Sequence, residues 1–257
     1  MKSLAKSLLR WPLRRLGYDI VNLRLNEQLF NLVPEISEAE AKAIDRIKPY
    51  TMGTYERLWA MVQAVHHVNR AGLGGDIVEC GVWRGGNVFL ARAIEQAFYP
   101  NSGRRYFLYD TFTGMSEPTA HDSVFLTGES AAGKYEASKR GEYVDWCYAS
   151  YEDVHGSAES LFGDTNDMVF VKGMIEQTLE APENLPERIA LLRLDTDWYE
   201  STRRELEVLY PRLVDGGVLI IDDYGRWKGA KQAVDEYFGD DVRWLHRVDY
   251  ACRLMVK

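Results

Sequence analysis

The sequence predicts an α/β fold built on a mostly parallel β-sheet with helices on both faces. Short apolar runs alternate with amphipathic stretches from residue 55 to residue 238, which is the order that parallel strands joined by helices require. Two more strands are expected at about 242–248 and 250–256, separated only by Asp249. Because so short a connection cannot cross over the sheet, these strands should form an antiparallel hairpin.

Helices are expected where apolar residues recur every three or four positions, and strands where a short apolar run lies between turn signals. The expected strands are 76–80, 105–110, 168–173, 189–195 and 217–222, and the expected helices are 55–70, 85–99, 151–162, 199–213 and 228–238. Residues 113–150 interrupt this rhythm with glycines among charged and hydroxyl-bearing side chains. The stretch is too long for an ordinary connection, so we expect a functional insertion or lid.

The composition of the chain argues against several classes of protein. The 257 residues carry a formal net charge of −8 and no long basic stripe, which is unfavourable for binding nucleic acid. The three cysteines are far apart and lack Cys-x-x-Cys spacing, which argues against a disulfide framework or a zinc site and favours a reducing, cytoplasmic compartment. No apolar run is long enough to span a membrane.

The start of the chain, MKSLAKSLLRWPLRRLGYDIV, combines basic side chains with leucines and a tryptophan. It lacks the continuous apolar centre of a secretory signal, and Pro12 interrupts any helix there. The stretch is either a weak membrane-surface anchor or an arm that packs on its own domain or on a second subunit. We favour a helical arm over residues 1–50, and with it a homo-oligomer, because one short basic stretch binds membranes only marginally. The folded domain would then occupy residues 51–257.

The first expected strand runs into the loop ECGVWRGG, which contains Gly81, Gly85 and Gly86. Such a loop lets the backbone approach a ligand before a helix begins. Glu79 stands just before it, where a carboxylate would repel a pyrophosphate but would suit an ammonium group. Asp110 ends the second strand, a position suited to ribose hydroxyls. A ribose and an ammonium without phosphates indicate S-adenosylmethionine, although the glycines alone could form an ordinary turn that Asp110 caps.

Carboxylates end two of the most apolar strands. Asp195 follows the run IALL, and Asp222 and Asp223 follow the run VLII. Neighbouring parallel strands would bring these carboxylates together, where they would repel one another unless a cation neutralised them. Because no His or Cys is near, we expect a hard divalent ion, Mg²⁺ or alternatively Ca²⁺ or Mn²⁺. The alternative is that Asp222 and Asp223 cap a turn, as Asp197 could cap the following helix.

The chain becomes recognisable in the motifs GDIVECGVWRGGN, LYDTFTGM, LRLDTDWYEST and GGVLIIDDYG. In this order, and over about residues 50–240, they resemble the macrocin O-methyltransferase family of metal-dependent sugar O-methyltransferases in macrolide and aminocoumarin pathways. The resemblance implies a class I methyltransferase fold, which is Rossmann-like, with S-adenosylmethionine as donor, Mg²⁺ as cofactor and a sugar hydroxyl as acceptor. The first 45 residues match none of these motifs, although an N-terminal arm is usual in the family.

The resemblance also assigns roles within the D-T-D pair, in which Asp195 would be a metal ligand and Asp197 the general base. A sugar hydroxyl is too weak an acid to react unaided at neutral pH, so a base must remove its proton. The stretch YTMGTYERL resembles the family segment that folds over the methionine end of the donor, which makes Thr51 and Met52 candidate contacts.

Other contacts follow from position along the chain. Gly173 and Met174 come directly after the third strand and would flank the adenine. His121 lies in the expected lid and is the rival candidate for the base, because lids often complete active sites. Trp198 and Tyr199 follow the D-T-D pair and could belong either to the core or to the wall of the acceptor site.

The expected function is therefore an S-adenosylmethionine- and Mg²⁺-dependent O-methyltransferase that acts on a sugar hydroxyl of a glycosylated natural product or glycan. A catechol-type phenol O-methyltransferase is the nearest alternative, since it uses similar metal chemistry on neighbouring hydroxyls. A third alternative is an inactive partner subunit that keeps the donor fold. The intact carboxylates argue against it: Glu79, Asp110, Asp195, Asp197, Asp222 and Asp223.

Overall fold

The computed structural model describes residues 12, 13, 15, 16, 33–241 and 244–257. The chain divides into two units, residues 1–37 and residues 38–257, and the fold and site described below belong to the second. Most of the basic start therefore lies outside the described residues, as do residues 242 and 243, where the terminal hairpin is expected to begin. Helix α3 (Glu38–Ile47) belongs to the larger unit, whereas the sequence predicts an arm as far as residue 50.

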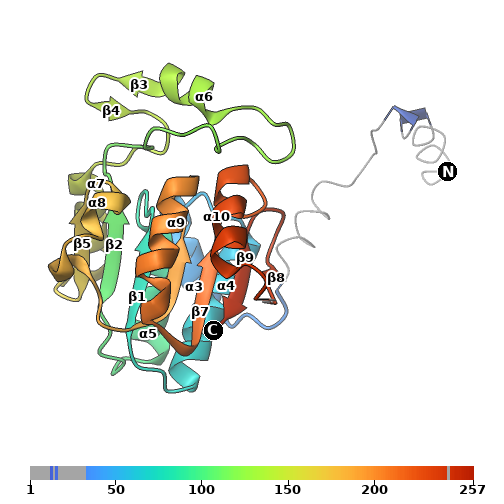
Figure 1. The fold of residues 1–257 in the computed structure, drawn as a ribbon. Helices are drawn as coiled ribbons and strands as arrows, with labels where there is room; N and C mark the ends of the chain where they lie inside the picture. Colours follow the sequence, from blue (N-terminus) through green and yellow to red (C-terminus); the bar gives the residue numbers. More distant parts are fainter. Residues whose placement is uncertain (1–11, 14, 17–32, 242–243) are drawn as a thin grey trace. The chain divides into compact units, whose positions relative to one another are not determined.

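A seven-stranded sheet forms the centre of the larger unit, in the order β5-β2-β1-β6-β7-β9-β8 (Figure 1). The strands are β1 (Asp76–Cys80), β2 (Tyr106–Asp110), β5 (Met168–Lys172), β6 (Ile189–Leu194), β7 (Leu213–Ile221), β8 (His246–Arg247) and β9 (Arg253–Val256). The first five strands in this order pair in parallel, whereas β9 runs antiparallel to β7 and to β8. The mostly parallel sheet and its terminal hairpin are confirmed, but the hairpin strands are shorter than predicted and residues 248–252, not Asp249 alone, connect them.

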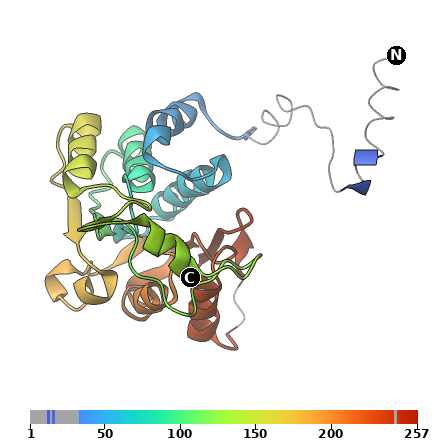
Figure 2. The ribbon, with the colours of Figure 1, turned by 90° about the horizontal axis from the view of Figure 1, so that it is seen from above.

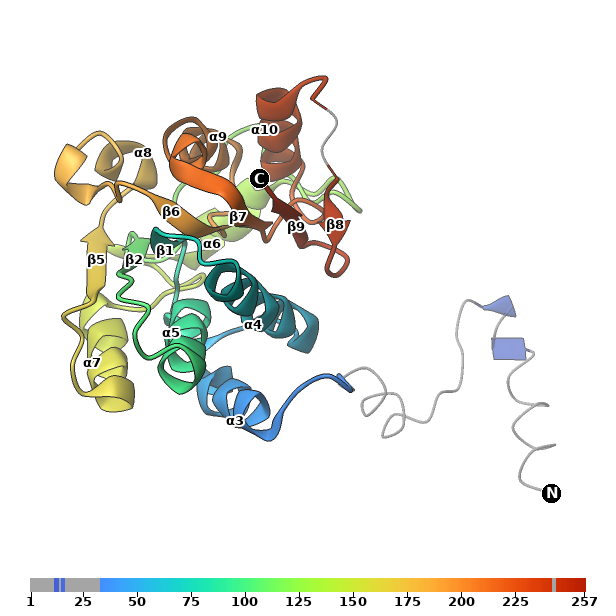
Figure 3. The same cartoon turned by 90° about the horizontal axis from the view of Figure 1, so that it is seen from below.

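Helices cover both faces of this sheet (Figure 3). One face carries α3, α4 (Tyr55–Arg70), α5 (Gly86–Phe98) and α7 (Tyr151–Phe162), and the other carries α8 (Ile175–Thr178), α9 (Tyr199–Val208) and α10 (Lys228–Phe238). Three 3-10 turns complete them: η1 (Lys48–Tyr50), η2 (Pro182–Asn184) and η3 (Tyr210–Arg212). Helix α9 ends before the predicted residue 213 because Pro211 cannot continue a helix. None of the described helices is long and apolar enough to cross a membrane.

The central strands are buried on both sides. Strand β6 is buried along its whole length, and β1 is buried from Ile77 onward. A parallel strand covered by helices on both faces has no solvent-facing side, which explains its near-continuous apolar sequence. Two buried charged residues nevertheless lie in these strands, Glu79 at 1% exposure and Arg193 at 3%, and they pair with each other. A buried charge needs such a partner, and this pair lies directly below the site described next.

The insertion at 113–150 forms a separate layer above the carboxyl ends of the parallel strands (Figures 1 and 2). It contains α6 (Ala131–Ser138) and a ribbon of β3 (Lys139–Arg140) and β4 (Tyr143–Val144). Its Trp146 packs against Trp198 and Trp227, with ring centroids 5.5 and 6.0 Å apart. The insertion thus covers the edge at which parallel α/β sheets bind ligands. That it opens and closes as a lid stays a prediction.

Candidate active site

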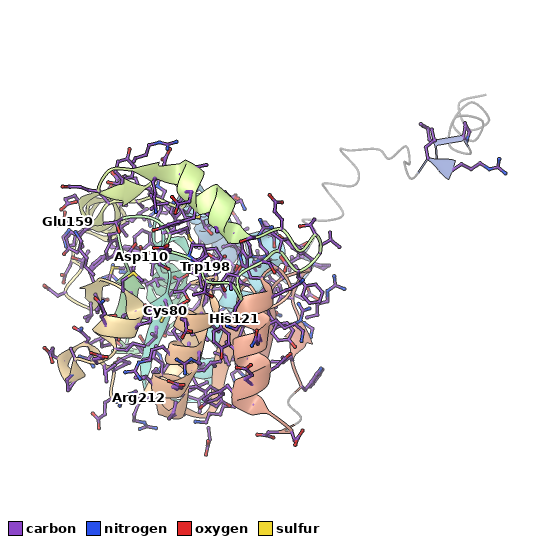
Figure 4. The ribbon with its side chains drawn as sticks, turned by 45° about the horizontal axis from the view of Figure 1, so that its top comes forward. Cys80, Asp110, His121, Glu159, Trp198 and Arg212 are labelled. Atoms are coloured by element: carbon purple, nitrogen blue, oxygen red, sulfur yellow. The ribbon has the colours of Figure 1, made fainter. Side chains whose placement is uncertain are left out.

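A cavity of about 390 Å³ lies at the carboxyl ends of the parallel strands, between the strand-end loops and the insertion. Figure 4 shows Asp110 and Trp198 at this end of the sheet and Arg212 at the opposite end. The predicted donor residues that line the cavity are Thr51, Met52, Gly81, Gly86, Asp110, Gly173 and Met174. The predicted metal and catalytic residues Asp195, Asp197, Asp222 and Asp223 line it too. The fold therefore brings both predicted sets to one cavity.

Glycines are required in the loop after β1 because other chain segments pass very close to it. Gly81 has φ of 80°, and a Cβ there would overlap the carbonyl oxygen of Asp195. A Cβ on Gly86 would lie 2.6 Å from the carbonyl oxygen of Tyr50. Gly85, with φ of 85°, caps the start of α5 and does not line the cavity. The glycines thus serve close packing between the loops that form the site, as well as access of a ligand to the backbone.

Glu79 lies behind the cavity wall rather than in it. Its carboxylate accepts hydrogen bonds from the backbone N–H of Val88 at 3.1 Å and from Nδ2 of Asn87 at 3.3 Å, and it pairs with Arg193. Both oxygens therefore already have partners within the protein. The predicted direct contact with a ligand ammonium is not available in this arrangement, because buried groups surround the carboxylate.

Asp110 faces the cavity from the end of β2. Its two oxygens accept hydrogen bonds from the backbone N–H groups of Trp83 at 2.9 Å and Phe112 at 2.8 Å. Both donors belong to residues with positive φ, 48° and 53°, so the flanking loops turn sharply in order to meet the carboxylate. Oδ1 also accepts a longer bond from the hydroxyl of Thr111 at 3.5 Å, so Oδ2 is the oxygen with the more accessible lone pair for a ligand hydroxyl.

Asp195, Asp222 and Asp223 form a carboxylate cluster, in which each residue offers an oxygen within 4.8 Å of the others. Burial raises the pKa of Asp195 and of Asp223 well above the usual range, and neighbouring carboxylates raise it further. Oδ2 of Asp223 is buried and accepts no hydrogen bond from the residues that the structure describes. A buried carboxylate oxygen without a donor is unfavourable, so the donor set fits a hard divalent cation.

Two arginines to which the sequence motifs assign no role neutralise part of this cluster. Arg193 pairs with Glu79 and Asp222 and donates to Oδ2 of Asp195 at 2.6 Å. Arg57 of α4 pairs with the other oxygen of Asp222. The sequence does contain a sign of the role of Arg193, because a charged residue inside an otherwise apolar strand must have ionic partners. Spare lone pairs remain on these carboxylates, so the arginine contacts leave room for a cation.

Asp197 lies in a tight turn next to this cluster, with φ of 69°, a value that few residues other than glycine adopt. Its Oδ1 accepts a hydrogen bond from Nε1 of Trp227 at 2.6 Å. The hydroxyl of Thr196 donates to Glu205 at 2.8 Å and holds the same turn from below. Burial, followed by the charge of Asp195, raises the pKa of Asp197 to about 7. A fixed carboxyl with a pKa near neutrality has the properties of a general base.

His121, the rival base, does not line the cavity. Its ring stacks on Tyr199 with 4.4 Å between centroids, and its Nδ1 lies 3.0 Å from Oε1 of Gln232, on the exposed side of α9 and α10 (Figure 4). Trp198 is 2% exposed and donates from Nε1 to a carbonyl of the insertion at 3.0 Å, so it is a core residue rather than an acceptor wall. It also occupies the N-cap of α9, the position that Asp197 could have filled.

The order and direction of the strands, the glycine loop after β1 and the acidic residue that ends β2 together define a class I S-adenosylmethionine-dependent methyltransferase. Within that class, the chain belongs to the macrocin O-methyltransferase (TylF) family, whose profile matches residues 26–253. The family resemblance and the fold inferred from the sequence are thereby confirmed.

Similar proteins are named as O-methyltransferases. The chain is 34% identical over 227 residues to the 8-demethyl-8-(2,3-dimethoxy-alpha-L-rhamnosyl)-tetracenomycin-C 4′-O-methyltransferase of Streptomyces olivaceus, covering 81% of each chain. It is 35% identical over 189 residues to the mycinamicin III 3″-O-methyltransferase of Micromonospora griseorubida, covering 73% of this chain and 70% of that one. The solved structure of the O-methyltransferase NovP matches with a TM-score of 0.67 and 30% sequence identity, and the match covers 81% of this chain and 82% of that one. The protein is an S-adenosylmethionine-dependent O-methyltransferase.

Proposed function

We propose that this enzyme methylates a sugar hydroxyl of a small-molecule natural product. We further propose that a bound divalent cation, Mg²⁺, assists the reaction. The carboxylate cluster beside Asp197, in the same cavity as the donor residues, carries this proposal. The names of two relatives support a sugar acceptor, since one specifies the 4′ oxygen of a rhamnosyl-tetracenomycin and the other the 3″ oxygen of mycinamicin III.

The donor would occupy the part of the cavity lined by the loops after β1, β2 and β5. Asp110 would accept hydrogen bonds from the ribose hydroxyls, and Gly173 and Met174 would flank the adenine. The methionine end would lie against the backbone of the glycine loop, below Thr51 and Met52. We propose that Glu79 serves this site indirectly, because its bonds to the N–H of Val88 and to Arg193 fix the start of α5 against β6.

The cation would be held by Asp195, Asp222 and Asp223. When bound, it would lower the pKa of an acceptor hydroxyl and orient that hydroxyl. Arg193 contacts Asp195 and Asp222 at once, and Arg57 holds Asp222 from α4. These arginines limit the mutual repulsion of the carboxylates and so keep the cluster compact before a ligand arrives.

Asp197 would take the proton of the acceptor hydroxyl. Trp227 occupies Oδ1, so Oδ2 is the oxygen available to receive it. As the O–H bond breaks towards Asp197, the acceptor oxygen forms a bond to the methyl carbon of the donor. The carbon–sulfur bond breaks at the same time, and the donor leaves as S-adenosylhomocysteine. The methyl group is already activated by its sulfonium, so alignment of the two substrates is the main contribution of the cavity.

Methyl transfer from labelled S-adenosylmethionine to a panel of glycosylated natural products, free sugars and catechols tests this function. We expect transfer to a sugar hydroxyl, loss of transfer in EDTA and recovery on addition of Mg²⁺. Titration of the donor in the absence of metal serves as the control for an intact donor site. Transfer to catechol in preference to every sugar would replace the sugar assignment with the phenol class. Full turnover in EDTA would exclude the role of the cation.

A further inference from the structure

Basic side chains in the cavity fall into two kinds. Among the described residues, Arg57, Lys134, Arg193 and Arg226 line it. Arg57 and Arg193 are paired with the carboxylates of the site. Lys134 and Arg226, by contrast, have no carboxylate within 4.0 Å in the described part of the chain. Lys134 and Arg226 are therefore the two cavity-lining cations that have no direct ionic partner among the described residues.

Both cations lie against tryptophan rings of the cavity wall, and one of these rings, that of Trp227, is hydrogen-bonded to the proposed base. Nζ of Lys134, on α6 of the insertion, is 3.9 Å from the ring centroid of Trp146. Cζ of Arg226, in the loop after β7, is 5.4 Å from the ring of Trp227 and its Nη1 donates to the hydroxyl of Tyr250 at 3.1 Å. The rings of Trp146 and Trp227 are themselves 6.0 Å apart. Each cation is thus held against one ring of the pair that flanks the base.

Some lysines elsewhere on the surface have an acidic partner one helical turn away, whereas other basic side chains, such as Lys172 and Arg188, have no carboxylate within 4.0 Å among the described residues. Lys42 pairs with Glu38 at 2.6 Å, and Lys139 pairs with Glu136 at 2.7 Å. The chain as a whole carries a net charge of −8. Against this acidic background, two cations with only neutral partners at the rim of a cavity create a local field that attracts anions.

We propose that Lys134 and Arg226 form an anion-binding subsite, and that the natural acceptor carries a phosphate ester or a carboxylate beside the sugar that is methylated. This inference rests on the proposed function and narrows its substrate class. Arg226 offers a planar fork of donors for two oxygens, and Lys134 offers a compact charge that the insertion brings to the cavity. The tryptophan rings restrict both side chains without neutralising them.

Calorimetric titration of the enzyme saturated with S-adenosylhomocysteine tests the subsite with three probes. L-rhamnose 1-phosphate carries a phosphate, D-galacturonic acid carries a carboxylate, and L-rhamnose carries no charge. We expect at least one anionic probe to bind more tightly than L-rhamnose. K134M and R226Q should each weaken binding of that probe about tenfold, the effect of losing one charge-assisted hydrogen bond. The probe that responds identifies phosphate or carboxylate as the natural group.

The controls separate this subsite from other cation effects. K139M removes a neighbouring lysine that already has a carboxylate partner, and it should leave all three affinities unchanged. Equal affinity of the anionic probes for the wild type and for the double variant K134M/R226Q would overturn the proposal. So would a loss of S-adenosylhomocysteine affinity in these variants, because the cations would then serve the carboxylate of the donor. Anionic binding that requires Mg²⁺ but not the two cations would overturn it as well.

The binding measurement is independent of catalysis, so the two proposals can fail separately. If the anionic probes bind through Lys134 and Arg226 but no sugar accepts a methyl group, the proposed function is wrong and the subsite stands. If sugars are methylated but the anionic probes bind K134M/R226Q as tightly as they bind the wild type, the function stands and the subsite is wrong.

Discussion

Nε1 of Trp227 donates a 2.6 Å hydrogen bond to Oδ1 of Asp197 and so joins the proposed base to the first residue before α10. The same indole packs against Trp198 and against Trp146 of the insertion, with ring centroids 5.0 and 6.0 Å apart. The orientation of the base is therefore set by the aromatic cluster on which the insertion rests. A small misplacement of a catalytic group can lower the rate substantially, so this contact should matter to turnover.

We expect Trp227→Phe to lower kcat about tenfold or more, because a hydrogen bond to a charged group contributes about 1.5–3 kcal/mol. The phenyl ring keeps most of the packing, so donor affinity should stay the same. The measurement is steady-state turnover together with calorimetric donor binding. Trp198→Phe is the matched control, since its indole donates to the insertion and not to Asp197. A kcat equal to that of the wild type would show that the base needs no such support.

Substitution of the two aspartates of the D-T-D turn should impair the enzyme in different ways. Asp195→Asn removes a charge from the carboxylate cluster and should weaken Mg²⁺ binding, so that excess Mg²⁺ restores part of the rate. Asp197→Asn keeps an oxygen for Trp227 but loses the proton acceptor. It should bind Mg²⁺ and donor normally and lose about 10²–10⁴ in rate, with no rescue by Mg²⁺. Turnover against Mg²⁺ concentration, with calorimetric metal binding, distinguishes the two. The reverse pattern of rescue would mean that ligand and base are exchanged.

Asp110 offers the cleanest test of the donor site. Asp110→Asn keeps a carbonyl oxygen for only one of the backbone N–H groups of Trp83 and Phe112, because they donate to different oxygens, and it removes the charge that ribose hydroxyls would meet. Thermal unfolding of the variant therefore serves as the control for an intact loop. We expect donor affinity to fall about tenfold or more. Asp153→Asn, an exposed change on α7, should bind the donor like the wild type. Calorimetric titration with S-adenosylhomocysteine measures both. Unchanged affinity in Asp110→Asn would place the ribose elsewhere.

The sequence was sufficient for the features that leave a local pattern. An apolar run followed by carboxylates marked the ends of β6 and β7, and parallel pairing of these strands then brought Asp195 and Asp222 together. Periodicity alone placed most helices, but it does not detect a proline, and the helix predicted over 199–213 ends early because of Pro211.

Side-chain contacts between different strands or between distant segments could not be predicted from such local patterns. The position of Glu79 at the end of β1 suggested a ligand contact, but its carboxylate is taken by Arg193 from the neighbouring strand. The aromatic cluster likewise joins Trp146, Trp198 and Trp227 from three distant parts of the chain. Such contacts depend on which strands are adjacent and how an insertion folds back, and no local period in the sequence records them.

The insertion at 113–150 should become protected when both substrates bind. It rests on the main domain through the aromatic cluster, through Asp122, which accepts a hydrogen bond from the backbone N–H of Tyr199 at 2.9 Å, and through two backbone hydrogen bonds that join residues 123 and 125 to residues 228 and 226 after β7. Closure would exclude water from methyl transfer, so we expect limited proteolysis within 113–150 to slow when S-adenosylhomocysteine and a sugar acceptor are both present. Cleavage at α7 serves as the internal reference. Cleavage that is indifferent to both ligands would count against a lid.

Glu205 provides a test of the turn that carries the proposed base. The residue is fully buried on α9, accepts a hydrogen bond from Thr196, and has an Oε2 without a partner among the described residues. Burial raises its pKa well above the usual range, although the bond from Thr196 opposes the shift. A carboxyl whose pKa is raised on folding stabilises the fold below its unfolded pKa of about 4.3, and this stabilisation is lost as the pH rises through the folded pKa.

We therefore expect Glu205→Gln, which stays neutral at every pH, to gain stability relative to the wild type as the pH rises. The difference should grow by about 1.4 kcal/mol per pH unit between the unfolded and folded pKa values. Urea unfolding at pH 5, 6, 7 and 8 measures it, and the exposed Glu207→Gln on the same helix is the matched control. Because Gln keeps an acceptor for Thr196, methyl transfer should change little. A stability difference independent of pH would mean that Glu205 is ionised in the folded protein and that an unrecognised donor holds Oε2.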